Sequence, residues 1–174
     1  MENALYSINL AIHIAAACLC VGGPFYQLRW VRMRGKLGYN IIYPFDKVME
    51  NTLHFQTKLC ALNKTILLTT GFAFPLIYYI FHGTWRDVST IALFIFSAKV
   101  ILTLLGGVIN SYTFFLLDFN IRKIFSLFLP HEQPRDEVLN RFWALRQRRT
   151  VMCRICFILV FVTALLTAWL RFYK

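Results

Sequence analysis

The sequence predicts an all-α protein that lies in a membrane as a bundle of four spanning helices. Hydrophobic residues make up 58% of the 174 residues, and the mean hydropathy is +0.56, which is too apolar for a soluble domain of this length. Four apolar stretches each reach the roughly 20 residues that an α-helix needs to cross a bilayer. Basic residues outnumber acidic ones by 19 to 8 and gather beside these stretches. We expect residues 1–174 to form a single transmembrane domain.

The expected spans run, in chain order, from Tyr6 to Val31, from Cys60 to Phe81, from Thr90 to Leu117 and from Val151 to Leu170. An even number of spans places both termini on one side of the membrane. The connections after the first and third spans are rich in arginine and lysine, whereas the other side carries only Arg86, Arg171 and Lys174. Cytoplasmic loops are enriched in these residues. We therefore expect both termini on the non-cytoplasmic side of an inner, cytoplasmic or equivalent membrane.

The net charge of +11 follows from this asymmetry. A strongly basic chain can indicate a nucleic-acid partner. Here, however, the cations lie directly beside membrane spans, where topology and anionic lipid headgroups account for them. We expect contact with the lipid bilayer and no nucleic-acid partner.

The segments outside the bilayer also have recognisable patterns. Pro44 suits the first turn of a helix, and the polar sequence that follows predicts that the second helix begins at about residue 45 and protrudes from the membrane. Two prolines mark residues 129–136 as a loop. The run RFWALRQRR at 141–149 is amphipathic if helical. It either lies at the membrane interface or forms a solvated extension of the fourth span.

His13 is the first candidate functional residue, because it lies inside an apolar helix. An imidazole in hydrocarbon needs a partner. A neutral imidazole is also a good axial ligand for haem iron, and the small residues Ala16, Ala17, Cys20 and Gly23 would leave a low surface beside it.

Lys99 is the second candidate, and it begins a polar face on the third span. Lys99, Thr103, Gly106, Asn110 and Thr113 recur at intervals of three or four, so they share one helical face, which should point inward. If each span is centred in the bilayer, Lys99 and His13 lie at similar depth. They then either enclose an anionic or electron-rich ligand, or Lys99 extends outward while His13 bonds a threonine or a carbonyl.

The first span resembles a known family. His13 precedes the pair Gly22 and Gly23, the helix ends with Phe25, Tyr26 and Arg29, and Lys99 follows in the third span. This pattern resembles the HemJ-type protoporphyrinogen oxidases and, more loosely, the CopD-like small membrane proteins. The resemblance implies a b-haem protein of four or five helices with His13 as haem ligand. It also implies that Arg29 and Lys99 are needed for function.

A second axial ligand is harder to find in the sequence. His54 falls near the cytoplasmic surface, whereas His82 lies on the same side as His13 but in or near a loop. A haem would be five-coordinate, use His82, or take a ligand from a partner subunit. His54 has two interpretations of its own: it joins Lys58 and Arg29 in a quinone-head or propionate site, or it is a solvated residue of the protruding helix.

Two functions from different classes follow. One is a membrane-embedded redox protein that binds haem b and either exchanges electrons with a quinone pool or a partner complex, or oxidises a porphyrinogen. The alternative is a non-catalytic accessory subunit of a larger membrane complex. We expect other membrane subunits or a homo-oligomer in either case, because four helices with small-residue faces leave little room for a macrocycle.

Overall fold

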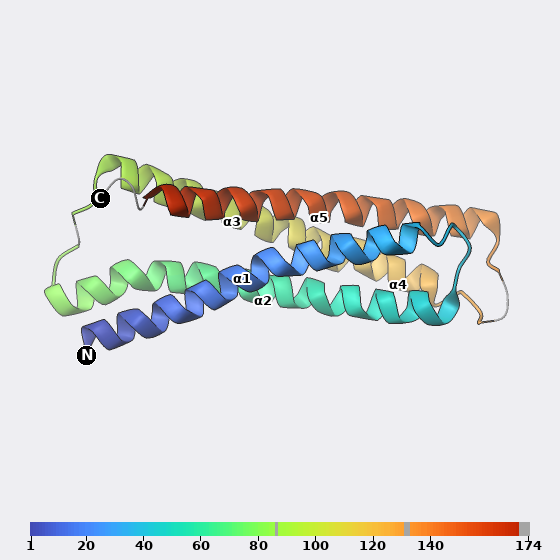
Figure 1. Cartoon of the computed structure of the whole chain (residues 1–174), viewed down its shortest axis with the longest axis horizontal. Helices are drawn as coiled ribbons and strands as arrows, with labels where there is room; N and C mark the ends of the chain where they lie inside the picture. Colours follow the sequence, from blue (N-terminus) through green and yellow to red (C-terminus); the bar gives the residue numbers. More distant parts are fainter. Residues whose placement is uncertain (86, 131–132, 171–174) are drawn as a thin grey trace.

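The computed structural model describes residues 1–85, 87–130 and 133–170, with the side chains of 168–170 excepted. The described residues form helices and loops without strands (Figure 1). In chain order the elements are α1 (Glu2–Gly35), α2 (Tyr43–His82), α3 (Thr90–Tyr112), the π-helical turn η1 (Thr113–Asp118), α4 (Phe119–Phe125) and α5 (Asp136–Leu170). Because α3, η1 and α4 follow one another without a break, the chain builds four long rods.

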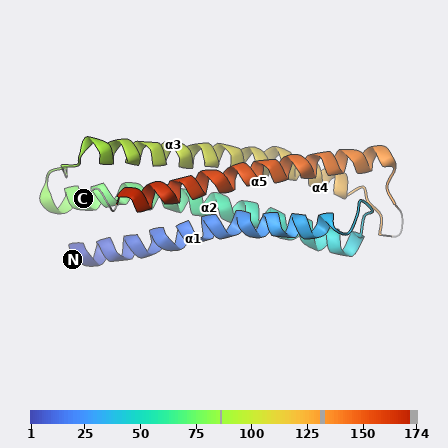
Figure 2. The same cartoon turned by 45° about the horizontal axis from the view of Figure 1, so that its top comes forward.

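The predicted all-α four-helix fold is confirmed, since all four rods are long and apolar enough to cross a membrane. Each rod packs against two others, in the order α1, α2, α3, α5 around the bundle (Figure 2). The early start of the second helix is also confirmed, because α2 begins at Tyr43 with Pro44 in its first turn. All four helices are longer than the predicted spans.

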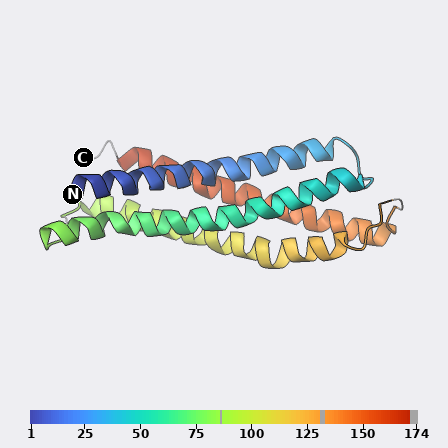
Figure 3. The same cartoon turned by 90° about the horizontal axis from the view of Figure 1, so that it is seen from below.

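The start of α1 and the end of α5 lie at the same end of the bundle (Figure 1). The connection 36–42 and the described residues of the second connection, 126–130 and 133–135, lie at the opposite end (Figure 3). We call it the charged end, because buried ionic side chains gather there. Which end faces the cytoplasm stays a prediction. Arg86, Arg171 and Lys174, on which part of that prediction rests, lie outside the described residues.

The bundle is longer than a membrane is thick. The 40 residues of α2 span roughly 60 Å at about 1.5 Å per residue, whereas the hydrocarbon core measures about 30 Å. The charged end, where ionic side chains gather, is therefore expected to lie outside the hydrocarbon core. It has a small hydrophobic core of its own, formed by Ile41, Ile121, Ile124, Phe128 and Phe142.

The basic run at 141–149 is a helical extension of the fourth span, as one of its two interpretations predicts, but only one of its faces is exposed to solvent. Phe142 is fully buried in the core of the charged end, and Arg146 and Arg149 are buried between helices. Three side chains of the run thus point into the bundle, and the two arginines among them meet acidic residues of other helices. The π-helical turn η1 contributes one of these acids, because it ends at Asp118, which is buried. Such turns occur often at functional positions in helices.

Candidate functional site

His13 is hydrogen-bonded across the α1–α2 interface. Its Nδ1 lies 2.7 Å from Thr70 Oγ1, and the Thr70 hydroxyl lies 2.6 Å from the carbonyl oxygen of Ile66. Because the hydroxyl hydrogen is directed to that carbonyl, we assign Nδ1–H of His13 as the donor to Thr70 Oγ1. This tautomer leaves the lone pair of Nε2 free. Of the two predicted alternatives for His13, the structure therefore shows the bond to a threonine.

Lys99 is half-buried on α3. The inward-facing polar stripe of the third span is also present, since Gly106, Asn110 and Thr113 are all buried. The roles of His13 and Lys99 as cofactor residues stay predictions, because no contact in the structure tests them.

The structure places the other predicted site residues apart from His13. Arg29 is exposed on α1. His82 lies at the far end of α2, where its Nε2 is 3.2 Å from Glu2 Oε1. His54 lies toward the charged end and stacks on Phe114 with ring centroids 5.3 Å apart. These three residues and His13 are therefore not brought together.

His54 faces an acid instead of the predicted cations. Its Nδ1 lies 3.6 Å from Asp118 Oδ2, and both atoms are buried with no hydrogen-bond partner among the described residues. Asp118 belongs to a buried charge network, which we define by three acids and three arginines: Asp46, Glu50, Asp118, Arg34, Arg146 and Arg149. The three positive and three negative charges cancel.

The charge network ties all four rods together at the charged end. Asp46 of α2 accepts hydrogen bonds from Arg34 of α1, at 2.7 and 2.9 Å, and from Arg146 of α5 at 3.0 Å. Glu50, one turn later, accepts from Arg146 at 2.7 Å and from Arg149 at 2.7 and 3.0 Å. Arg149 also donates to Asp118 at 3.1 Å. The bidentate geometry gives these pairs a fixed orientation.

Electrostatics favour the ionised forms of Glu50 and Arg149. Burial alone would raise the pKa of Glu50, but the guanidinium groups of Arg149 and Arg146 outweigh this effect and hold its pKa below the ordinary value. Burial likewise opposes the charge of Arg149, yet Glu50 and Asp118 raise its pKa above the usual range. For Arg146 burial dominates and lowers the pKa.

Lys64 is a third polar feature, which lies within the predicted second span. It is 6% exposed, and its Nζ donates a hydrogen bond to the carbonyl oxygen of Gly106 at 2.6 Å. The next nearest partner is the Sγ atom of Cys156 at 3.7 Å. Sequence reasoning missed this residue, although a lysine among the apolar residues of a span is itself a signal.

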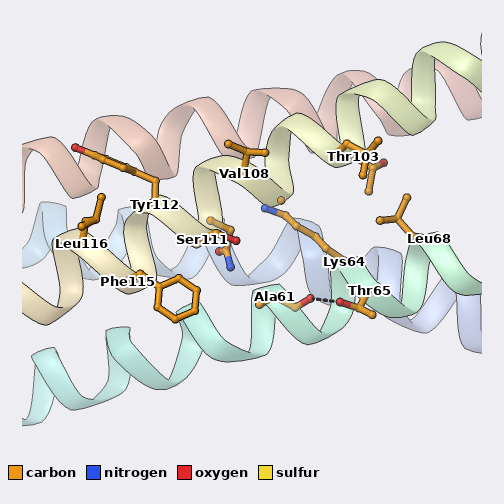
Figure 4. Close-up of a pocket in the computed structure, with 13 residues that line it drawn as sticks. Ala61, Lys64, Thr65, Leu68, Thr103, Val108, Ser111, Tyr112, Phe115 and Leu116 are labelled. Carbon is orange, nitrogen blue, oxygen red and sulfur yellow. Dashed lines mark hydrogen bonds between the residues drawn. The ribbon is translucent and has the colours of Figure 1, made fainter.

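A cavity of about 660 Å³ lies between α2 and α3, with Lys64 in its wall (Figure 4). Its lining combines apolar side chains, such as Leu68 and Val108, with polar residues including Thr103 and Asn110. His13 is not among the lining residues. We call this cavity the Lys64 groove.

No family model, curated protein or solved structure matches this chain. Its function must therefore be argued from its own residues. Within the described residues, no cluster of three or more histidine, cysteine, aspartate or glutamate side chains is arranged to hold a metal ion. A haem iron needs only one or two protein ligands, so a single histidine such as His13 is enough to bind it.

Proposed function

We propose that the protein is a membrane-embedded redox protein that binds haem b through Nε2 of His13. The supporting observation is the hydrogen bond between His13 Nδ1 and Thr70 Oγ1, at 2.7 Å. Histidines that bind metals commonly donate the other ring N–H to a fixed acceptor, which selects the tautomer and orients the ring. Thr70 supplies such an acceptor and leaves Nε2 with a free lone pair.

The chemistry of the donor fits a haem iron, although His13 provides a single ligand. Haem, when bound, would supply one-electron transfer at its iron. Lys99, which the sequence places at a depth similar to that of His13, would offer a positive charge to a propionate. The Lys64 groove is not lined by His13. His54 lies beside Asp118 and His82 beside Glu2, so neither histidine is placed to bind the same iron as His13. A second copy of the chain or another membrane subunit would therefore complete the site.

The proposal extends to location and partners. We place the protein in an inner or cytoplasmic membrane, with both termini on the non-cytoplasmic side, because basic residues gather at the charged end. The electron partner would be a quinone pool or a partner complex. If the protein is an enzyme, the reaction we propose is oxidation of a porphyrinogen. This reaction rests on the resemblance of the first span to the HemJ-type oxidases.

A reduced-minus-oxidised visible spectrum tests the haem proposal. Protein purified from native-like membranes should show the α-band of a b-type haem, and His13→Ala should lose it because the iron loses its axial ligand. His54→Ala and His82→Ala are matched controls that should keep the band. Thr70→Val should keep the band but shift the midpoint potential, because the hydrogen bond to Nδ1 is removed.

The absence of a band in fully expressed wild-type protein would contradict the haem proposal. It would favour the non-catalytic accessory subunit. Loss of the band in His54→Ala alone would contradict the assignment of His13.

A further inference from the structure

Lys64 carries a positive charge that the bundle does not neutralise. Among the described residues no carboxylate lies within 4.0 Å of its Nζ. The contacts of the ammonium are one carbonyl oxygen, of Gly106 at 2.6 Å, and one sulfur atom, of Cys156 at 3.7 Å. A thiol is a weak acceptor. An ammonium group in hydrocarbon without a counter-ion is costly and is usually functional.

The Lys64 ammonium lies close against the backbone of α3. A Cβ atom at position 106 would lie 3.4 Å from Lys64 Nζ and 3.6 Å from its Cε, which is ordinary van der Waals contact. Gly107, the next residue, lines the groove. The lysine is held across the gap between α2 and α3 instead of extending to the membrane surface.

The Lys64 groove is shaped for a molecule from the bilayer. Its volume of about 660 Å³ is in the range of small-molecule sites. Leu104, Val108 and Phe115 form an apolar rim that is at least half exposed on the outside of the bundle. Figure 4 shows Lys64 crossing from α2 toward α3 between Val108 and Thr65, with Phe115 and Leu116 farther along the gap. A long apolar chain could therefore lie along the groove.

Polar groups near Lys64 add hydrogen-bonding capacity. Asn110 is buried and donates to the carbonyl oxygen of Thr57 at 3.3 Å. Ser111 and Tyr112 line the same cavity and are exposed, and no hydrogen bond of their hydroxyl groups is formed within the described residues. These groups can bind oxygen atoms of a ligand headgroup.

We propose that the Lys64 groove binds a lipophilic carboxylate, with the acid group at Lys64 and the alkyl chain along the apolar rim. The charge of the Lys64 ammonium decides the chemical class of the ligand, because a carboxylate neutralises this group in a site of low dielectric constant. A quinone carbonyl or an ester would accept a hydrogen bond but leave the charge uncompensated. The site is separate from His13 and does not depend on haem binding.

Photolabelling of the full chain in uncharged detergent micelles tests this proposal. The probe is a long-chain carboxylic acid with a photoreactive group in its alkyl chain, and its methyl ester is the matched control. The acid should label peptides from the groove, within residues 61–68 and 103–116. Labelling should be roughly tenfold or more above that of Lys64→Met, because the buried counter-charge is lost.

Three variants make the labelling interpretable. Lys58→Met removes a lysine of the same helix that does not line the groove, and it should label like wild type. Val108→Trp fills the exposed rim with Lys64 intact, and it should reduce labelling even if Lys64→Met does not fold. A thermal unfolding curve of each variant checks its fold.

Competition identifies the ligand class. Excess unlabelled carboxylic acid should suppress labelling, whereas the methyl ester and a long-chain quinone should not. Equal labelling by acid and ester, equal labelling of wild type and folded Lys64→Met, stronger competition by the quinone, or labelling outside the groove would each overturn the proposal.

Discussion

Asp46→Ala is expected to destabilise the protein by about 3–5 kcal/mol, the cost typical of removing one partner from a buried ion pair. The Asp46 carboxylate is fully buried. It accepts two hydrogen bonds from Arg34, at 2.7 and 2.9 Å, and one from Arg146 at 3.0 Å. It also accepts the backbone N–H of Ile42 at 2.9 Å, at the start of α2. Alanine leaves two buried guanidinium groups short of negative charge.

The midpoint of thermal unfolding in detergent micelles, followed by circular dichroism, measures this effect. Glu137→Ala is the matched control, because this acid is exposed at the start of α5 and its removal should cost less than about 1 kcal/mol. Replacing Asp46, Arg34 and Arg146 together with apolar residues of similar size should recover much of the lost stability. An Asp46→Ala protein that unfolds at the wild-type temperature would show that the charge network does not hold the helices together.

The positions of the helices could be predicted from the sequence, because each one depends on the length and hydropathy of its own stretch of residues. The apolar stretches predicted four rods, and Pro44 predicted the early start of α2. The charge network could not be read in this way, since its members come from α1, α2, η1 and α5. Basic residues at a helix end predict membrane topology equally well whether they face solvent or a buried acid.

The candidate sites show the same limit. His13 was singled out because an imidazole in an apolar helix needs a partner, and a threonine was one of its predicted alternatives. Lys64 was missed because its importance depends on contacts with Gly106 of α3 and Cys156 of α5. His54 was compared with cations at a similar depth, but the π-helical turn brings Asp118 toward it instead. The rotation of each helix about its own axis decides these contacts, and hydropathy does not determine it.

Glu50→Gln is expected to cost about 3 kcal/mol at neutral pH, and the difference from wild type should shrink in acid. Glu50 is buried and bonded to Arg146 and Arg149, so the neutral amide would leave Arg146 with Asp46 alone and Arg149 with Asp118 alone. The pKa of Glu50 is lower in the folded protein than its ordinary value of 4.5. The unfolded chain therefore binds a proton at a higher pH than the folded chain does.

The sign of the pH dependence follows from this difference. The stabilisation by ionised Glu50 is fully present above pH 4.5, and it is lost as the pH falls through the lowered pKa of the folded state. Below that pKa, the wild-type carboxyl is neutral, like the amide of Glu50→Gln. Unfolding midpoints of both proteins, measured from neutral pH down into this range, should therefore converge. A difference that stays constant with pH would mean that Glu50 does not contribute through its charge, and the ion pairs with Arg146 and Arg149 would then not explain the stability of the charged end.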